Sequence, residues 1–255
     1  MMKRQVFFGF LASLLLFSCA PKHYQLANVE RTRIIVDSRY DKNPDEAAVK
    51  FLEPYKKVND SIMGPIVGVV AHNMYADRPE SDLSNLLADI LVWASKDYGE
   101  QPVLGIYNMG GIRAALTKGN VTYGDVLDVA PFENRICFIT LTGEKMLKLF
   151  RQIANRGGEG VSHGVELVIS KDGKLLSSKL HGKEIDPKAE YRVATINYLI
   201  EGNDGMPALK EGTNIIAPTD KSNNTRFLIM NYFRDHQARG VMVDSKVEGR
   251  IKVKD

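Results

Sequence analysis

One apolar run that ends at a pair of glycines constrains the fold of this chain more than any other feature. Residues 103–107 predict a buried strand, and Asn108, Gly110, Gly111 and Arg113 follow it directly. A glycine has no Cβ, so main-chain N–H groups there can lie against a bound group. The guanidinium of Arg113 adds a planar fork of donors that suits phosphate or carboxylate. The pattern indicates a ligand-binding turn, with an ordinary tight turn as the alternative.

The next segment leads from a helix to an aromatic side chain. Residues 119–120, Gly-Asn, predict a turn. Thr122 then has the character of an N-cap, and Asp125 lies three residues further on, where an acidic side chain stabilises a helix start. The short helix is expected to end at Pro131 and to leave Phe132 exposed.

The first 18 residues have the layout of a secretory signal peptide. Lys3 and Arg4 are followed by an apolar stretch over residues 6–17, which is too short to span a bilayer. The sequence therefore predicts an exported protein and a signal peptide over residues 1–18.

A lipobox-like site, Leu-Phe-Ser-Cys, ends this leader. It predicts lipidation of Cys19 and a lipidated tether over residues 19–31, although a signal peptide cleaved without lipidation is the alternative. Ala20 follows the cysteine, as in lipoproteins that are sent to the outer membrane. We expect a lipid-anchored protein on the periplasmic face of the outer membrane.

Charge and cysteine content argue against nucleic-acid binding and against a disulfide within the chain. The chain has 34 Lys and Arg against 31 Asp and Glu, and the leader contributes two of the basic residues. The remaining charges nearly balance, so there is no basic footprint for nucleic acid. If Cys19 is lipidated, Cys137 has no partner in the chain for a disulfide. Because Cys137 lies in an apolar run, we expect it to be a buried core residue.

Periodicity along the rest of the chain mixes helices with hairpins and predicts an α+β fold with mixed β-sheets and packed helices. The expected domains are an N-terminal strand and linker helix over residues 32–63 and one large domain over residues 64–255. The expected helices cover residues 45–62, 81–96, 122–130, the stretch after 143, and 224–237. The expected strands cover residues 32–37, 66–70, 103–107, 136–139, 165–169, 175–180 and 191–195, with a last one around residue 251.

Four segments in this order resemble the motif series of the 5′-nucleotidase C-terminal domain family: NMGGIRAAL, VTYGDVLDVAPFEN, ITLTGEKMLKLF and YRVATINYLIEGNDGM. That family is the substrate-binding half of bacterial periplasmic UDP-sugar hydrolases and of animal ecto-5′-nucleotidases. The resemblance runs from about Ile66 to the C-terminus and implies the family's fold, preceded by a linker helix. Ser84 and Asn203 depart from it, because the family usually has glycine at both positions.

The resemblance implies a role for several side chains. Phe132 and Tyr198 match the aromatic pair that clamps a nucleobase, a contact that tolerates any base. Core or rim packing of these rings is the alternative. Asp204 matches the acidic residue that holds the ribose hydroxyls, because a carboxylate can accept from both. A local turn cap is the alternative for Asp204.

A phosphate-binding role is implied for Arg113, with Asn108, Gly110 and Gly111 around the ligand. Arg78 is a second, weaker candidate, because its spacing differs from the family pattern by one residue and Pro79 follows it. The histidines 72, 163 and 181 have no carboxylates at ligand spacing, so we expect hydrogen-bonded or solvated side chains and no metal site in this chain.

The family's catalytic metals lie in a separate metallophosphoesterase domain with Asp-x-His and Gly-Asn-His-Asp/Glu signatures, and neither string occurs here. The resemblance therefore implies the nucleotide-binding half of a split 5′-nucleotidase-type hydrolase in nucleotide catabolism. A separate metallophosphoesterase chain would supply the divalent metals. The alternatives are a non-catalytic lipoprotein that binds nucleotides or nucleosides and, least well supported, a self-sufficient hydrolase.

Overall fold

The computed structural model describes residues 24–254, in two units that divide between Phe51 and Leu52. The predicted signal peptide and Cys19 lie outside the described residues. The strand expected over residues 32–37 is wrong, because these residues form no regular structure. A strand needs a partner for its backbone N–H and C=O groups, and this stretch pairs with none in the described chain. Within residues 24–254, no helix is long and apolar enough to cross a membrane.

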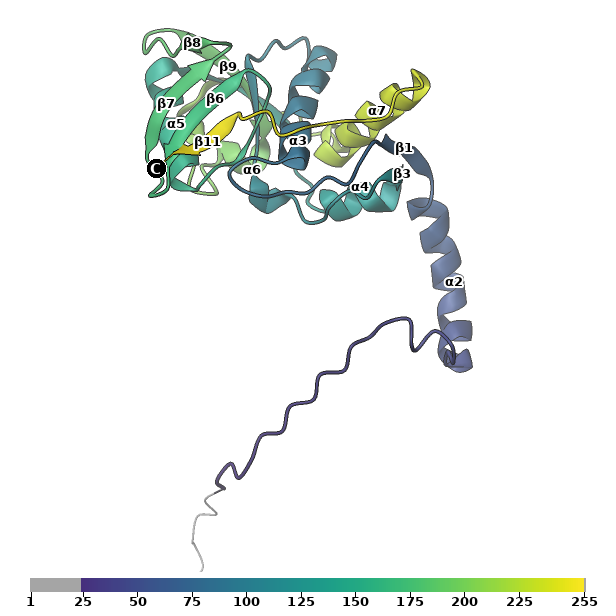
Figure 1. Cartoon of the computed structure of the whole chain (residues 1–255). Helices are drawn as coiled ribbons and strands as arrows, with labels where there is room; N and C mark the ends of the chain where they lie inside the picture. Colours follow the sequence, from purple (N-terminus) through teal and green to yellow (C-terminus); the bar gives the residue numbers. More distant parts are fainter. Residues whose placement is uncertain (1–23, 255) are drawn as a thin grey trace, which may run out of the picture. The chain divides into compact units, whose positions relative to one another are not determined.

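Helix α2 (Glu46–Met63) matches the helix expected over residues 45–62 (Figure 1). The Asp45 carboxylate starts it by accepting hydrogen bonds from the backbone N–H groups of Ala47 and Ala48 at 2.9 and 3.1 Å. None of the helix residues is buried.

A five-stranded mixed sheet forms the centre of the large unit, in the order β10 (Thr213–Ile216), β4 (Ile136–Thr142), β9 (Glu190–Ile196), β2 (Leu104–Tyr107) and β5 (Gly160–Val161). Strands β2 and β9 are parallel and the other pairs are antiparallel. The first six residues of β4 are all buried, which shows that both faces of the sheet are covered. Cys137 is one of them, and this confirms its expected place in the core.

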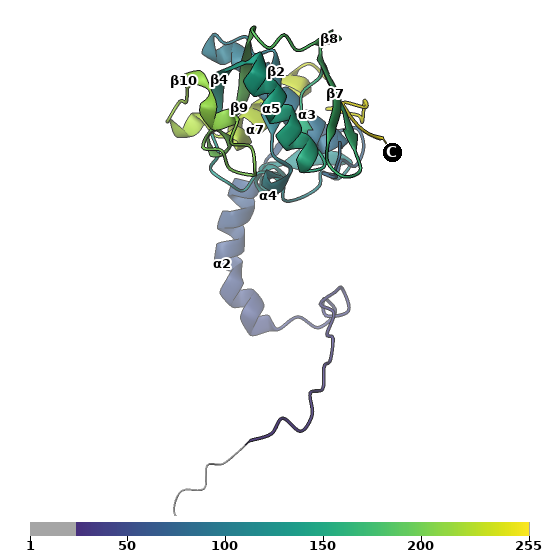
Figure 2. The same cartoon turned by 90° about the vertical axis from the view of Figure 1, so that its left-hand side faces the viewer.

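Two helices pack on this sheet (Figure 2). Helix α3 (Asp82–Ala94) contacts β2, β5 and β9, whereas α5 (Gly143–Asn155) contacts β4 and β9 and also the second sheet. Ser81 caps α3 by accepting from the N–H of Ser84, and Gly99 ends the following 3₁₀ turn in the left-handed conformation. The side chains of α5 that face the core are Met146, Leu149, Phe150 and Ile153.

The second sheet has the order β11 (Ile251–Lys254), β6 (Val165–Ser170), β7 (Leu175–Leu180) and β8 (Lys183–Glu184), and its β6–β7 hairpin was predicted. Strand β1 (Ile66–Val70) pairs instead with β3 (Gly119–Thr122). The turn expected at residues 119–120 is therefore wrong. These two residues pair with Val70 and Val69, because β1 supplies a partner strand that local turn chemistry does not reveal. Helix α7 (Thr225–Ala238) covers β1.

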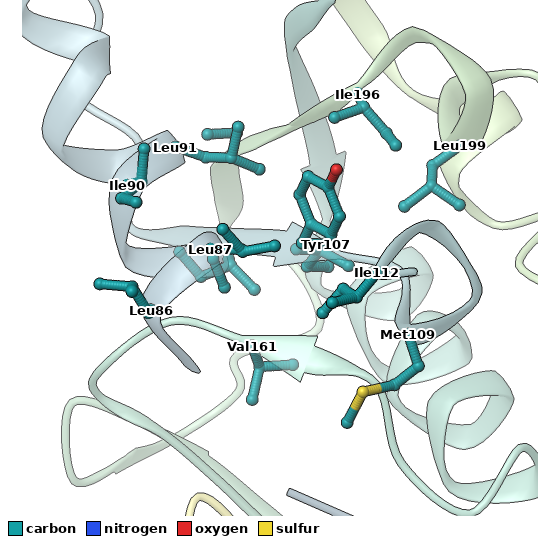
Figure 3. Packing of buried hydrophobic residues seen from close by; sticks show 14 of the residues in the cluster. Leu86, Leu87, Ile90, Leu91, Tyr107, Met109, Ile112, Val161, Ile196 and Leu199 are labelled. Atoms are coloured by element: carbon teal, nitrogen blue, oxygen red, sulfur yellow. The ribbon is translucent and has the colours of Figure 1, made fainter. Parts of the chain in front are cut away.

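The core beside the end of β2 is tightly packed. Figure 3 shows Tyr107 among Leu87 and Leu91 of α3 and Ile196 of β9, all of which are buried. Burial raises the pKa of Tyr107 to about 12, so this phenol stays neutral in the core. The end of β2 is thus anchored on several sides, and the loop that follows it starts from a rigid base. The mixed sheets and packed helices confirm the predicted α+β class.

Candidate functional site

The backbone after β2 forms a tight turn. Residues Met109–Gly111 make one 3₁₀ turn, in which the N–H of Gly111 donates to the carbonyl of Asn108 at 3.0 Å. A Cβ on Gly111 would lie 2.7 Å from Asn108 Oδ1, so no larger residue fits there without a shift. The glycine pair thus allows the Asn108 side chain to lie directly against the main chain.

Two aromatic side chains are partly exposed near this turn. Thr122 and Asp125 form the predicted capping box of α4 (Tyr123–Val129), and the chain then passes Pro131 and presents Phe132 with 46% of its surface exposed. Tyr198 belongs to the short helix α6 (Asn197–Ile200) and is 37% exposed. Neither ring is a buried core residue, so core packing does not account for them.

Asp204 connects the turn to Tyr198. Its Oδ2 accepts a hydrogen bond from Asn108 Nδ2 at 2.6 Å, and its Oδ1 accepts one from the Tyr198 hydroxyl at 3.2 Å. Asp204 has a φ of 52°, in the left-handed region that aspartate tolerates in turns. Burial and the neighbouring carboxylate raise the pKa of Tyr198, so its hydroxyl remains a donor at neutral pH.

A cavity of about 170 Å³ lies between these groups. Ligand pockets commonly have about 300–1,000 Å³, so this one has room for part of a ligand, such as a ring system and its nearest substituents. Six of the predicted site residues line it together with Asn134, which was not predicted as a site residue: Asn108, Gly110, Gly111, Phe132, Tyr198 and Asp204. Segments almost 100 residues apart in sequence therefore meet at one cavity.

The two predicted arginines lie outside the lining of this cavity. Arg113 is exposed, and its Nη1 lies 3.5 Å from the carbonyl of Gly110, which is a weak contact that leaves its donors accessible. Arg78 Nε donates to the carbonyl of Gly158 at 2.9 Å, and Arg78 also pairs with Glu159. Arg78 is therefore held by protein groups, in keeping with its weaker match to the family pattern.

Sequence reasoning missed the acidic residue beneath the turn. The side chain of Glu159 is fully buried and accepts from the N–H of Met109 at 2.6 Å and from Arg156 Nε at 2.5 Å. The stretch Arg-Gly-Gly-Glu-Gly over residues 156–160 was the available signal, because a charged pair among glycines indicates close backbone approach. Glu159 thus holds the turn through the backbone N–H of Met109.

The three predicted non-ligand histidines all have hydrogen-bonding partners. His72 lies 3.3 Å from Asp82 and 3.2 Å from Asp244, and the imidazole of His163 lies 3.0 Å from Glu248. His181 Nε2 contacts the carbonyl of Val103 at 2.9 Å. Across residues 24–254, no three His, Cys, Asp or Glu side chains form a group that could hold a metal ion.

The model of the family described as "5′-nucleotidase, C-terminal domain" matches residues 66–211, which is more than half of the chain. The chain belongs to the 5′-nucleotidase C-terminal domain family. The match includes the β2 turn, Phe132, Tyr198 and Asp204, so the whole cavity lies within the family domain.

Individual relatives show the same relationship. The chain is 27% identical to protein UshA of Yersinia enterocolitica over 168 residues, which cover 65% of this chain and 30% of UshA. It is also 27% identical to the trifunctional nucleotide phosphoesterase protein YfkN of Bacillus subtilis over 237 residues, which cover 85% of this chain and 16% of YfkN. This chain thus spans less than a third of the length of either relative.

A solved structure confirms the fold assignment. The crystal structure of a 5′-nucleotidase precursor from Thermus thermophilus superposes with a TM-score of 0.68 at 25% sequence identity. The superposition covers 82% of this chain and 43% of that one. The family's fold therefore extends over most of the described residues.

The buried Glu159 carboxylate should be essential for the stability of the site. Glu159→Gln keeps the shape but removes the charge that balances Arg78 and Arg156, and we expect the free energy of unfolding to fall by about 2–4 kcal/mol. Urea denaturation followed by circular dichroism measures this. The control Glu190→Gln, at an exposed position, should change it by less than about 0.5 kcal/mol. An equally small effect of Glu159→Gln would contradict this role.

Proposed function

We propose that this chain is the substrate-binding half of a 5′-nucleotidase-type hydrolase that acts in nucleotide catabolism. A separate metallophosphoesterase chain would supply the metal centre. The proposal rests above all on one observation: two partly exposed aromatic rings and one carboxylate line the same cavity within the family domain. A nucleoside has a flat base for the rings and vicinal hydroxyls for the carboxylate.

The base would lie between Phe132 and Tyr198. Stacking of a base on an aromatic ring contributes roughly 1–3 kcal/mol and tolerates every base, which suits a hydrolase of broad nucleotide range. Asp204 would accept from the ribose hydroxyls, because its two protein donors use only part of the capacity of a carboxylate. Asn108, Gly110 and Gly111 would border the ligand on the side of the β2 turn.

The phosphate of the bound nucleotide would lie outside the cavity, beside Arg113. This side chain is exposed and has only the weak contact to Gly110, so its guanidinium fork is available to an anion. A phosphate bound there would stand at the rim of the domain, where a partner chain can reach it. Arg113 would then stabilise the charge that builds up on the phosphate during displacement.

The residues of this chain do not fit the family's metal centre. Among the described residues that line the cavity, Asp204 is the one carboxylate, and no three His, Cys, Asp or Glu side chains within residues 24–254 form a group that could hold a metal. We therefore assign no reaction step on a metal to this chain. The sequence adds Cys19 as the proposed lipid attachment site, which would hold both halves at the periplasmic face of the outer membrane.

Titration calorimetry of the purified protein with AMP, adenosine and UMP tests the binding half of this proposal. We expect Kd values of roughly 0.1–1 mM for all three, because this chain holds the base and ribose but only part of the phosphate site. The double variant Phe132→Ala, Tyr198→Ala should lose most of the heat. The control Tyr75→Ala removes an exposed tyrosine outside the cavity and should bind normally. Absence of heat for all three ligands in the wild type would overturn the assignment.

Steady-state kinetics with the partner metallophosphoesterase test the division of labour. Arg113→Ala should lower kcat by roughly 100-fold or more, because the charge on the phosphate grows in the transition state. Phe132→Ala should mainly raise KM, because stacking is felt similarly in the ground and transition states. Arg113→Lys should recover little activity, since a point charge does not replace the fork. An unchanged kcat in Arg113→Ala would place Arg113 outside the active site.

A further inference from the structure

Arg156 lies between the buried carboxylate of Glu159 and the carboxylate of Asp204, which lines the cavity. It follows α5 directly, and its Nε donates to the buried Oε1 of Glu159 at 2.5 Å. Its Nη2 lies 4.0 Å from Oδ2 of Asp204, which lines the cavity. The Arg156 side chain is 30% exposed and the Glu159 side chain is fully buried, so most of the surface of this pair is shielded from water. One planar fork thus spans an internal anchor and a cavity group.

Contacts other than the one to Arg156 also hold the Glu159 side chain in place. Its side chain has no solvent exposure, and its Oε2 accepts from the N–H of Met109 at 2.6 Å, in the turn after β2. Arg78 pairs with the same Oε1 atom of Glu159. Three groups therefore hold Glu159, and Glu159 in turn fixes the position of the Arg156 guanidinium.

The same guanidinium lies against the loop that carries Asp204. A Cβ on Gly205 would lie 3.6 Å from Arg156 Nη1 and 3.8 Å from its Cδ, so the side chain packs closely on this part of the loop. Asp204 and Gly205 both have positive φ values, of 52° and 66°. Such a turn needs restraint by its surroundings, and Arg156 supplies contact and opposite charge together.

The hydrogen bonds to Asp204 leave it able to accept more. Asn108 donates to Oδ2 and Tyr198 donates to Oδ1, one bond on each oxygen. A carboxylate has about four lone-pair sites, so capacity for about two further donors remains. Two neighbouring hydroxyls of a ribose supply that number, provided that the carboxylate is held in one orientation.

We propose that Arg156, held by Glu159, is a positioning residue that orients Asp204 towards the vicinal hydroxyls of a ribose. The chain then discriminates between ribonucleosides and 2′-deoxyribonucleosides. This inference rests on the proposed nucleoside-binding function and adds the sugar class and the residue that selects it. Arg156 acts through Asp204 and makes no contact with the base.

Titration calorimetry with adenosine, 2′-deoxyadenosine and adenine tests the proposal on the full protein. The wild type should bind adenosine about tenfold more tightly than 2′-deoxyadenosine, because one charged hydrogen bond is lost with the 2′-hydroxyl. Arg156→Met should weaken adenosine binding by roughly fivefold to tenfold and bring the two nucleosides close to equal affinity. Adenine, which has no sugar, should bind the variant as it binds the wild type.

Two further variants separate positioning from damage to the fold. Arg156→Lys keeps a positive charge beside Glu159, but its single ammonium cannot span both carboxylates, so it should also lose discrimination. Arg151→Met removes an exposed arginine of α5 and should change none of the three affinities. In Asp204→Asn, adding Arg156→Met should have no further effect on adenosine.

Each contrary result has a distinct meaning. An equal loss of adenine and adenosine binding in both Arg156 variants would show a structural role only and overturn the inference alone. Retained discrimination in Arg156→Met would overturn it as well. If the wild type bound adenosine no better than adenine, Asp204 would not be a ribose ligand. Failure of the wild type to bind any of the three would overturn the proposed function and the inference together.

Discussion

The buried carboxylate of Glu159 is the interaction on which the geometry of the site depends. It receives the N–H of Met109 from the turn after β2 and the side chains of Arg78 and Arg156. A carboxylate without solvent is costly unless donors surround it, and here the surrounding donors come from segments about 50 and 80 residues apart. Satisfying one charge therefore draws three segments to a common point. The cavity forms beside that point.

Under the proposed function, this arrangement would separate recognition from chemistry. The aromatic rings, Asp204 and the glycine turn line one cavity, while Arg113 is exposed with its donors accessible. The proposed contacts to the base and ribose would lie away from the phosphate. Binding energy from such contacts can orient the reacting group.

Much of this could be predicted from the sequence, for reasons that are local. The strand before Asn108, the cap at Thr122 and the β6–β7 hairpin depend on neighbouring residues, and each was confirmed. The pairing of Gly119 with Val70 and the roles of Glu159 and Arg156 depend on partners far along the chain. The local Arg-Gly-Gly-Glu-Gly pattern over residues 156–160 indicates a close backbone approach, but it does not identify those distant partners. Residues 32–37 show the reverse case, a strand-like pattern without a partner in the described structure.

We expect this cavity to bind a nucleoside through its base and ribose. A crystal structure of the protein soaked with AMP tests it most directly. We expect the adenine ring between Phe132 and Tyr198, both ribose hydroxyls within about 3.2 Å of the Asp204 carboxylate, and the phosphate on the side of Arg113. Adenine bound elsewhere, or a ribose turned away from Asp204 with the aromatic rings empty, would contradict it.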